Sequence, residues 1–225
     1  MIKAGNTVYR GREDLPEEIP VFPLTGALLL PGGQMPLNIF EPRYVKMIDD
    51  AVSNNKLIGI IQPCLKPENS GVEPPPLCKI GCIGRITAYQ ESGDGRYLIS
   101  LSGVCRFKVV EEIDNDLSYR SCRIEVMQED LGEVGNACEQ IDREHLLAAF
   151  RKYLEANGLD ADWSTVKKTS TDTLVTALCM MSPYGPAEKQ ALLEAPDVRS
   201  RAETLIMISE MHIAHQSGDE GGTLQ

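Results

Sequence analysis

The spacing of apolar residues changes once along this 225-residue chain, and this change constrains the fold more than any other feature. From about Ile19 to Met127 apolar residues recur at every second position, which is typical of half-buried strands. After about Ala137 they recur with the period of an α-helix. The sequence therefore predicts an α+β protein with a strand-rich half followed by a helical half, and residues 128–137 are the candidate boundary.

The strand-rich half contains at least four expected strands, and we expect them to be largely antiparallel. The alternating or continuous apolar runs that predict them are residues 57–61, 77–90, 97–109 and 119–126. Gly103 interrupts the third run and predicts a bulge or a sharp bend. One helix is expected to begin near Pro42 and to end at Asn54-Asn55. A closed or half-closed barrel would cover the edges of these strands.

The helical half shows four stripes of apolar residues at helical spacing. Asn157-Gly158 predicts the end of the first helix, and Pro183 predicts the end of the second. Pro186 and Pro196-Asp197 mark the starts of the third and fourth. We therefore divide the chain into a polar N-terminal arm (1–18), a β-rich subdomain (19–130), a helical subdomain (131–216) and a flexible tail (217–225).

The chain is acidic, with 22 Lys and Arg against 33 Asp and Glu and a net charge of −11. Such a charge repels phosphate backbones and anionic lipid at long range. No run approaches the roughly 18–20 apolar residues that span a bilayer, and the N-terminus has no apolar signal segment. We expect a cytoplasmic protein whose seven cysteines are free thiols.

The acidic excess is concentrated in residues 128–162, which contain nine acids and three bases. Two interpretations stay open for this segment. It forms a solvated helix face with its flanking loops, or it is a docking surface for a basic partner.

The sequence contains little that predicts catalysis, a metal or a cofactor. Cys78 and Cys82 lie about 13 Å apart on a strand and cannot share one zinc ion; with Cys105 and Cys122 they are interpreted as small buried hydrophobes. His212 and His215 share a helix face, yet no third ligand lies near them in the sequence. Motifs for nucleotide phosphates, for a serine nucleophile and for zinc peptidases are absent. We expect no metal and no cofactor, and a hydrolase using Cys64 or Cys179 stays as the enzymatic alternative.

Residues 28–44 are apolar but are broken by prolines and glycines, so they cannot form one helix or one clean strand. Such a segment either plugs the end of a barrel or lies on the surface. On the surface it would form a patch for extended or unfolded peptide. The apolar residues of that patch are Leu30, Met35, Leu37 and Phe40.

The same segment carries a resemblance to a known family. Ile19-Pro20-Val21-Phe22-Pro23-Leu24 and Pro36-Leu37-Asn38-Ile39-Phe40-Glu41-Pro42-Arg43-Tyr44 resemble the opening of the Lon protease N-terminal, substrate-binding domain. The runs at 80–86, 101–107 and 181–201 are similar to later motifs of that domain. The resemblance covers residues 18–212.

The resemblance implies a six-stranded pseudo-barrel of PUA-like type with one inserted helix, followed by a helical bundle with a long last helix. It also implies a non-catalytic module that binds peptide or misfolded protein, acts as an adaptor, and could work with a Lon-type protease. Arg43 and Tyr44 join the candidate binding residues through the matched motif. The chain ends where the ATPase and protease domains would begin, so we expect neither activity. The sequence does not predict an oligomeric state.

Nucleic-acid binding is the alternative that the pseudo-barrel suggests by architecture. It would require the basic residues of the strand half to gather on one face. Those residues are Arg85, Arg96, Arg106, Lys108, Arg120 and Arg123.

Overall fold

The computed structural model describes residues 1–64, 71–132 and 141–219, with side chains to residue 214. Within it the chain forms two compact units. The first combines Met1–Glu133 with Pro183–Leu193, and the second combines Val134–Ser182 with Glu194–Gln225. The two units are treated separately below.

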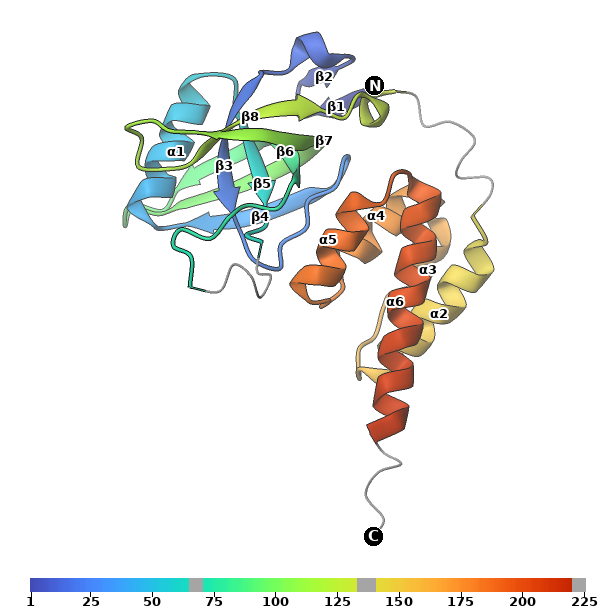
Figure 1. Ribbon diagram of the computed structural model, residues 1–225. Helices are drawn as coiled ribbons and strands as arrows, with labels where there is room; N and C mark the ends of the chain where they lie inside the picture. Colours follow the sequence, from blue (N-terminus) through green and yellow to red (C-terminus); the bar gives the residue numbers. More distant parts are fainter. Residues whose placement is uncertain (65–70, 133–140, 220–225) are drawn as a thin grey trace. The chain divides into compact units, whose positions relative to one another are not determined.

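The first unit contains eight described strands, three short helical segments and one longer helix (Figure 1). The strands are β1 (Ile2–Ala4), β2 (Thr7–Tyr9), β3 (Glu18–Pro23), β4 (Gln34–Ile39), β5 (Leu57–Ile61), β6 (Ile80–Glu91), β7 (Tyr97–Ile113) and β8 (Ser121–Val126). The helical segments are η1 (Arg12–Asp14), α1 (Pro42–Ser53), η3 (Gln128–Leu131) and α5 (Pro186–Glu194).

Strands β3 to β8 form one sheet in the order β4-β7-β6-β5-β3-β8, and β8 pairs back with β7. This return pairing curls the sheet into a ring, so the predicted six-stranded pseudo-barrel with an inserted helix is confirmed. All neighbouring pairs are antiparallel except β3 with β5. That pair is parallel because the chain passes through β4 and α1 before it returns.

The 17-residue strand β7 supports two different neighbours on the same edge. Its first part pairs with β4, and its second part pairs with β8. The change occurs at Gly103, which pairs with Gly84, while Cys105 pairs with Ile83 and leaves Val104 as an extra residue. The bulge predicted at Gly103 is therefore confirmed. A Cβ at Gly103 would lie 2.0 Å from the carbonyl oxygen of Leu30, so the close passage of these two backbones requires glycine.

The interior of the barrel is an apolar cluster contributed by most of its strands. The ring of Phe107 lies close to Gly59 and Gly81, whose missing side chains make room for it. Buried members from the strands include Ile19, Val21, Leu57, Ile61, Ile83, Val104, Cys105, Cys122, Ile124 and Val126.

The N-terminal residues differ from the polar arm that the sequence predicts for 1–18. Strands β1 and β2 form an antiparallel hairpin. Its Ala4 and Tyr9 are almost completely buried in the apolar cluster, together with Leu15. The segment has too few apolar residues to show a strand period, and the docking of its few apolar side chains decides its structure.

Helix α5 also differs from the prediction, which placed it with the other helices. Gln62 donates its side-chain amide to the carbonyl oxygen of Pro186 and to Gln190 Oε1, and Gln190 donates to the carbonyl oxygen of Ile80. These polar contacts with the barrel join α5 to the first unit. A helical period reports only that a helix forms, and not which unit it packs on.

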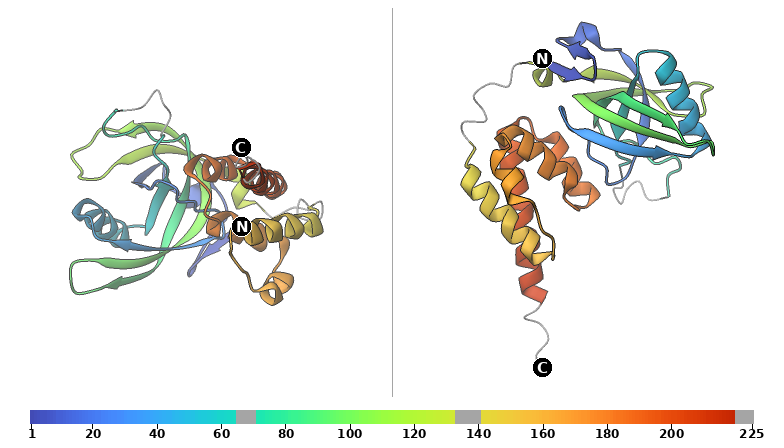
Figure 2. Two further views of the ribbon diagram at one scale, coloured as in Figure 1. Left: turned by 90° about the horizontal axis from the view of Figure 1, so that it is seen from below. Right: turned by 180° about the vertical axis from the view of Figure 1, so that it is seen from behind.

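The second unit is helical, with α2 and α6 side by side (Figure 2). Its helices are α2 (Arg143–Ala156), α3 (Trp163–Lys168), α4 (Thr171–Met181) and the 22-residue α6 (Val198–Asp219). The long last helix and the helix ends at Gly158 (φ +63°) and Pro183 are confirmed. The short α3 was not predicted; Asp162 caps its N-terminus by accepting from the N–H groups of Ser164 and Thr165.

Candidate functional site

Strand β4 is the outermost strand of the barrel sheet, and among the described residues its backbone is paired on one edge only. Its neighbour is β7, in a register that runs from Gln34 opposite Ser102 to Ile39 opposite Tyr97. Gln34, Pro36 and Asn38 are exposed. The second edge of β4 therefore faces outward from the sheet.

The hydrogen-bonding pattern shows which backbone groups point outward. The N–H of Gly103 donates to the carbonyl oxygen of Gly33, and the carbonyl oxygen of Ser100 accepts from the Thr87 hydroxyl on the β6 side. Alternation along an antiparallel pair then turns Gln34, Pro36 and Asn38 away from β7. Proline is compatible with this position because no hydrogen bond between β4 and β7 needs an N–H from residue 36.

A shallow groove of about 570 Å³ lies across β4, β7 and β6 beside this edge. The register places Leu98 of β7 between Asn38 and Gln90, with a side chain that is 49% exposed. All residues that line the groove are uncharged: Pro36, Leu37, Asn38, Ala88, Tyr89, Gln90, Leu98, Ile99 and Ser100. In a chain of which 24% is charged, this is an unusually neutral surface.

The structure divides the apolar segment 28–44 between the interior and the surface. Leu30 is completely buried with Leu28 and Leu29, as a plug would be. Met35 and Leu37 are half-buried on β4, and Phe40, which follows the strand, is 63% exposed. The two predicted arrangements of this segment therefore both occur, in different parts of it.

Tyr44 and Arg43 lie in the first turn of α1. Tyr44 is buried, with its ring centroid 4.2 Å from that of Phe22. The exposed Arg43 guanidinium lies 4.6 Å from the centroid of the Tyr44 ring and forms an ion pair with Glu41. Leu30 and Tyr44 are thus core residues that a ligand cannot reach, and we leave both out of the candidate surface. The remaining candidates are Met35, Leu37, Phe40 and Arg43, of which Met35 and Leu37 share the face of β4 that carries the buried Ile39.

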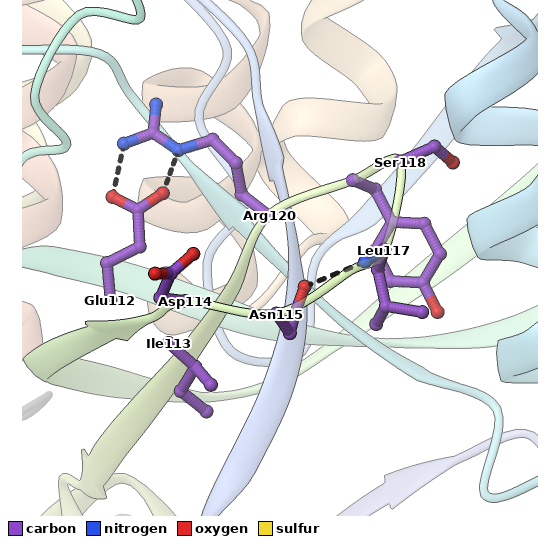
Figure 3. A pocket seen from close by; sticks show the side chains of 8 residues that line it. Glu112, Ile113, Asp114, Asn115, Leu117, Ser118 and Arg120 are labelled. Atoms are coloured by element: carbon purple, nitrogen blue, oxygen red, sulfur yellow. Dashed lines mark hydrogen bonds and ion pairs between the residues drawn. The ribbon is translucent and has the colours of Figure 1, made fainter.

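A second hollow of about 300 Å³ lies at the connection between β7 and β8 (Figure 3). Arg120 donates through Nε and Nη2 to the Glu112 carboxylate and through Nη1 to the carbonyl oxygen of Pro75. This pairing neutralises the cation of the hollow, so it does not offer an anion site. Sequence reasoning had not singled out this hollow.

Most of the described arginines of the strand half lie in ion pairs or hydrogen bonds. Arg106 is fully buried against Asp130, Arg96 pairs with Asp94, and Arg123 pairs with Glu18 and Glu111. Arg85 donates to the Tyr9 hydroxyl and to the carbonyl oxygen of Asn55. Most of the cations that the nucleic-acid alternative would need are already engaged.

The described cysteines differ in how far they are buried. Cys82, Cys105, Cys122 and Cys179 are buried, and burial is the main cause that raises the pKa of Cys105 to about 12 and of Cys122 to about 11. Cys78 is half-exposed just before β6, so its interpretation as a buried hydrophobe was wrong. Cys64 is also partly exposed.

The part of the chain that the structure describes has no group of three His, Cys, Asp or Glu side chains that could hold a metal ion. His145 lies 3.4 Å from Glu210, and the ring of His212 packs edge-on against Tyr153. The side chain of His215 lies outside the described residues.

Several acids of the segment 128–162 have structural partners. Asp130 pairs with Arg106, and Asp142 and Asp162 cap the N-termini of α2 and α3. Residues 133–140 lie outside the described residues. The proposed docking surface for a basic partner therefore loses three of its nine acids and stays a prediction.

Comparison with known protein families shows which family this chain belongs to. The model of the ATP-dependent protease La (LON) substrate-binding domain matches residues 18–209. The chain belongs to this family. The predicted resemblance to the Lon-type substrate-binding domain is therefore confirmed.

Relatives and solved structures agree with this assignment. A Lon protease from Parabacteroides distasonis is 30% identical over 88% of this chain, and Lon protease 2 from Myxococcus xanthus is 24% identical over 87%. The chain spans 24% of the length of each of these curated relatives.

Two solved structures share the fold. The Lon N-terminal domain protein from Xanthomonas campestris has a TM-score of 0.60 and 22% identity over 84% of this chain and 97% of its own. The N-terminal domain of the Mycobacterium avium complex Lon protease has a TM-score of 0.60 and 21% identity over 87% of this chain and 99% of its own.

Among the described residues, no helix has the length and apolar character to cross a membrane.

Proposed function

We propose that this chain is a non-catalytic, cytoplasmic Lon-type module that binds peptide segments of unfolded or misfolded protein on the surface formed by Met35, Leu37, Phe40 and Arg43. The observation that carries the proposal is the exposure of Phe40, 63% of whose surface is open to solvent beside an uncharged groove. Family membership supports a role in binding substrate protein.

The energetics of this surface suit weak, broad recognition. Burying one large apolar side chain stabilises a complex by roughly 1.5–3 kcal/mol, which is about tenfold to a hundredfold in affinity. Arg43 is held over Tyr44 and beside Glu41, so it borders the surface as a positioned cation. A single exposed aromatic side chain together with an uncharged groove favours apolar segments and gives low sequence specificity.

The adaptor role is part of this proposal. A bound segment would be presented to a protease, and a Lon-type protease is the partner that the relatives suggest. Of the two cysteines of the enzymatic alternative, Cys179 is buried, which supports a non-catalytic role, whereas Cys64 is partly exposed; burial also raises the pKa values of Cys105 and Cys122. A thiol with so high a pKa is a poor nucleophile at neutral pH.

The proposal is tested by measuring the binding of labelled segments of a permanently unfolded protein to the full chain. We expect Phe40→Asp to weaken binding at least tenfold because it places a charge where an apolar anchor should be buried. Met181→Asp is the matched control, since Met181 is 82% exposed and lies in the second unit. Absence of binding to every segment, or equal effects of the two substitutions, would refute the proposal.

A further inference from the structure

We infer that β4 receives an extended, uncharged peptide segment as an additional strand, held by the outward backbone groups of Gln34, Pro36 and Asn38. The inference rests on the proposed function and adds to it the binding mode and the chemical class of the segment. Three features of the edge carry it.

The first feature is the set of backbone groups on the outer edge. The N–H groups of Gln34 and Asn38 point away from β7, and no described residue outside the β4–β7 ladder accepts from them. The carbonyl oxygens of Gln34, Pro36 and Asn38 point the same way. Donors and acceptors at every second residue match the backbone of another extended chain.

The second feature is the lack of protection along this edge. Natural edge strands usually carry charged residues, prolines, bulges or a covering segment that prevents pairing with another chain, and of these devices β4 has only the single Pro36 within the described residues. The chain has no charged residue from Gln34 to Phe40, and the register of β4 with β7 is continuous over that strand. Pro36 removes one donor but leaves the outward N–H groups on either side of it.

The third feature is that the groove is lined by uncharged residues, which selects the class of segment. An added strand would lie about 4.8 Å beyond β4, so a long side chain could reach back across Pro36 toward Leu98 in the neutral groove. A charged side chain placed there would lose hydration without gaining a partner. The edge therefore favours segments that are extended and uncharged.

The test compares two substitutions at one position. Asn38→Pro removes an outward N–H while it leaves the ladder with β7 intact, and Asn38→Ala removes the same side chain but keeps the N–H. The probe is a capped, soluble nine-residue peptide that repeats valine, threonine and glutamine three times. We expect Asn38→Pro to bind it at least fivefold more weakly than Asn38→Ala does.

A measurement on the unaltered chain keeps the test valid if Asn38→Pro folds poorly. Amide hydrogen exchange of Gln34 and Asn38 should slow at least tenfold when the peptide is added. The same peptide with N-methyl groups on alternate residues should not slow it, because it cannot donate to β4.

The outcomes separate this inference from the proposed function. If the peptide binds and Phe40→Asp abolishes binding, but the two amides gain no protection and the Asn38 variants bind equally, strand addition is wrong and the proposed function stands. If these amides are protected without peptide in a concentration-dependent way, β4 pairs with a second copy and the peptide assignment is overturned. If no peptide binds, both fail.

Discussion

The two parts of strand β7 have the same neighbour on one edge but opposite chemistry on the other. Residues 97–103 lie beside β4 and contain no charged residue. Residues 107–113 lie beside β8, and this part of β7 with Arg106 is rich in charge. Glu111 pairs with Arg123 on β8, Glu112 with Arg120 just before β8, and Arg106 with Asp130 in η3. The first part of β7 thus lies in an uncharged region beside the edge strand β4, and its second part lies in a region of ion pairs beside β8.

The difference separates a part of the barrel whose strands are paired on both edges from a part whose last strand is paired with one neighbour. At the closed part, β8 is paired on both sides, with β3 and β7, and polar side chains satisfy one another. At the open part, β4 has β7 as its partner, and two large apolar side chains are exposed nearby, Leu98 on β7 and Phe40 just after β4. Five substitutions outside the proposed binding surface, two of them matched controls, would sharpen or break this comparison.

The largest effect is expected at the closed part for Arg106→Met. The guanidinium donates to both oxygens of Asp130 and to the carbonyl oxygen of Leu193 at the end of α5. Its loss leaves a carboxylate that is 10% exposed without its cation, which should lower the free energy of unfolding by about 3–5 kcal/mol. Urea unfolding measures this change.

Arg123→Met is the matched control for that prediction, because Arg123 is 50% exposed in its pairs with Glu18 and Glu111. An exposed ion pair contributes at most about 1 kcal/mol. Equal destabilisation by the two substitutions would show that the closed part does not depend on its buried pair.

A smaller effect is expected at Gly103, where β7 passes from one neighbour to the other. Gly103→Ala would place a methyl group 2.0 Å from the carbonyl oxygen of Leu30 and push β7 away from the buried segment Leu28–Leu30. We expect a loss of about 3 kcal/mol in the free energy of unfolding, as for severe overpacking.

Gly132→Ala tests whether that loss comes from the contact, since the nearest atom to its Cβ would lie 3.6 Å away. Its effect should stay within about 0.5 kcal/mol. If Gly103→Ala is equally mild, the two parts of β7 are not separated by a tight backbone passage.

The smallest effect concerns Tyr119, which precedes β8 and donates its hydroxyl to Asp50 on α1. Burial first, and then this hydrogen bond, raise the pKa of Tyr119 to about 12. A phenol with a raised pKa stabilises the fold fully below about pH 10, the unfolded value, and loses that contribution as pH rises to about 12.

Tyr119→Phe should therefore cost about 1 kcal/mol at pH 7, and the difference from the unaltered chain should shrink between pH 10 and 12. Urea unfolding at a series of pH values measures it, and phenolate absorbance follows the titration itself. A difference that is constant across this range would mean that the hydroxyl does not bond to Asp50 in solution.

The sequence predicted much of the fold because many elements carry their own local signals. Pro42 begins α1, Gly158 follows the end of α2, and alternation locates β5 to β8. Strand β4 had no such signal, since Pro36 interrupts a short apolar run. The broken apolar segment gave Phe40 as a candidate and the family motif added Arg43, whereas the outward edge of Gln34 and Asn38 was not predictable from spacing.

What the sequence determined by itself is the kind of structure in each half, because strand and helix periods are properties of neighbouring residues. Tertiary structure decided the rest: that Leu30 is core while Phe40 is surface, that α5 joins the barrel, and that Arg106 meets Asp130. Each depends on contacts between residues distant along the chain. The open edge of β4 is of the same kind, because a free edge exists only when a sheet has been assembled around it.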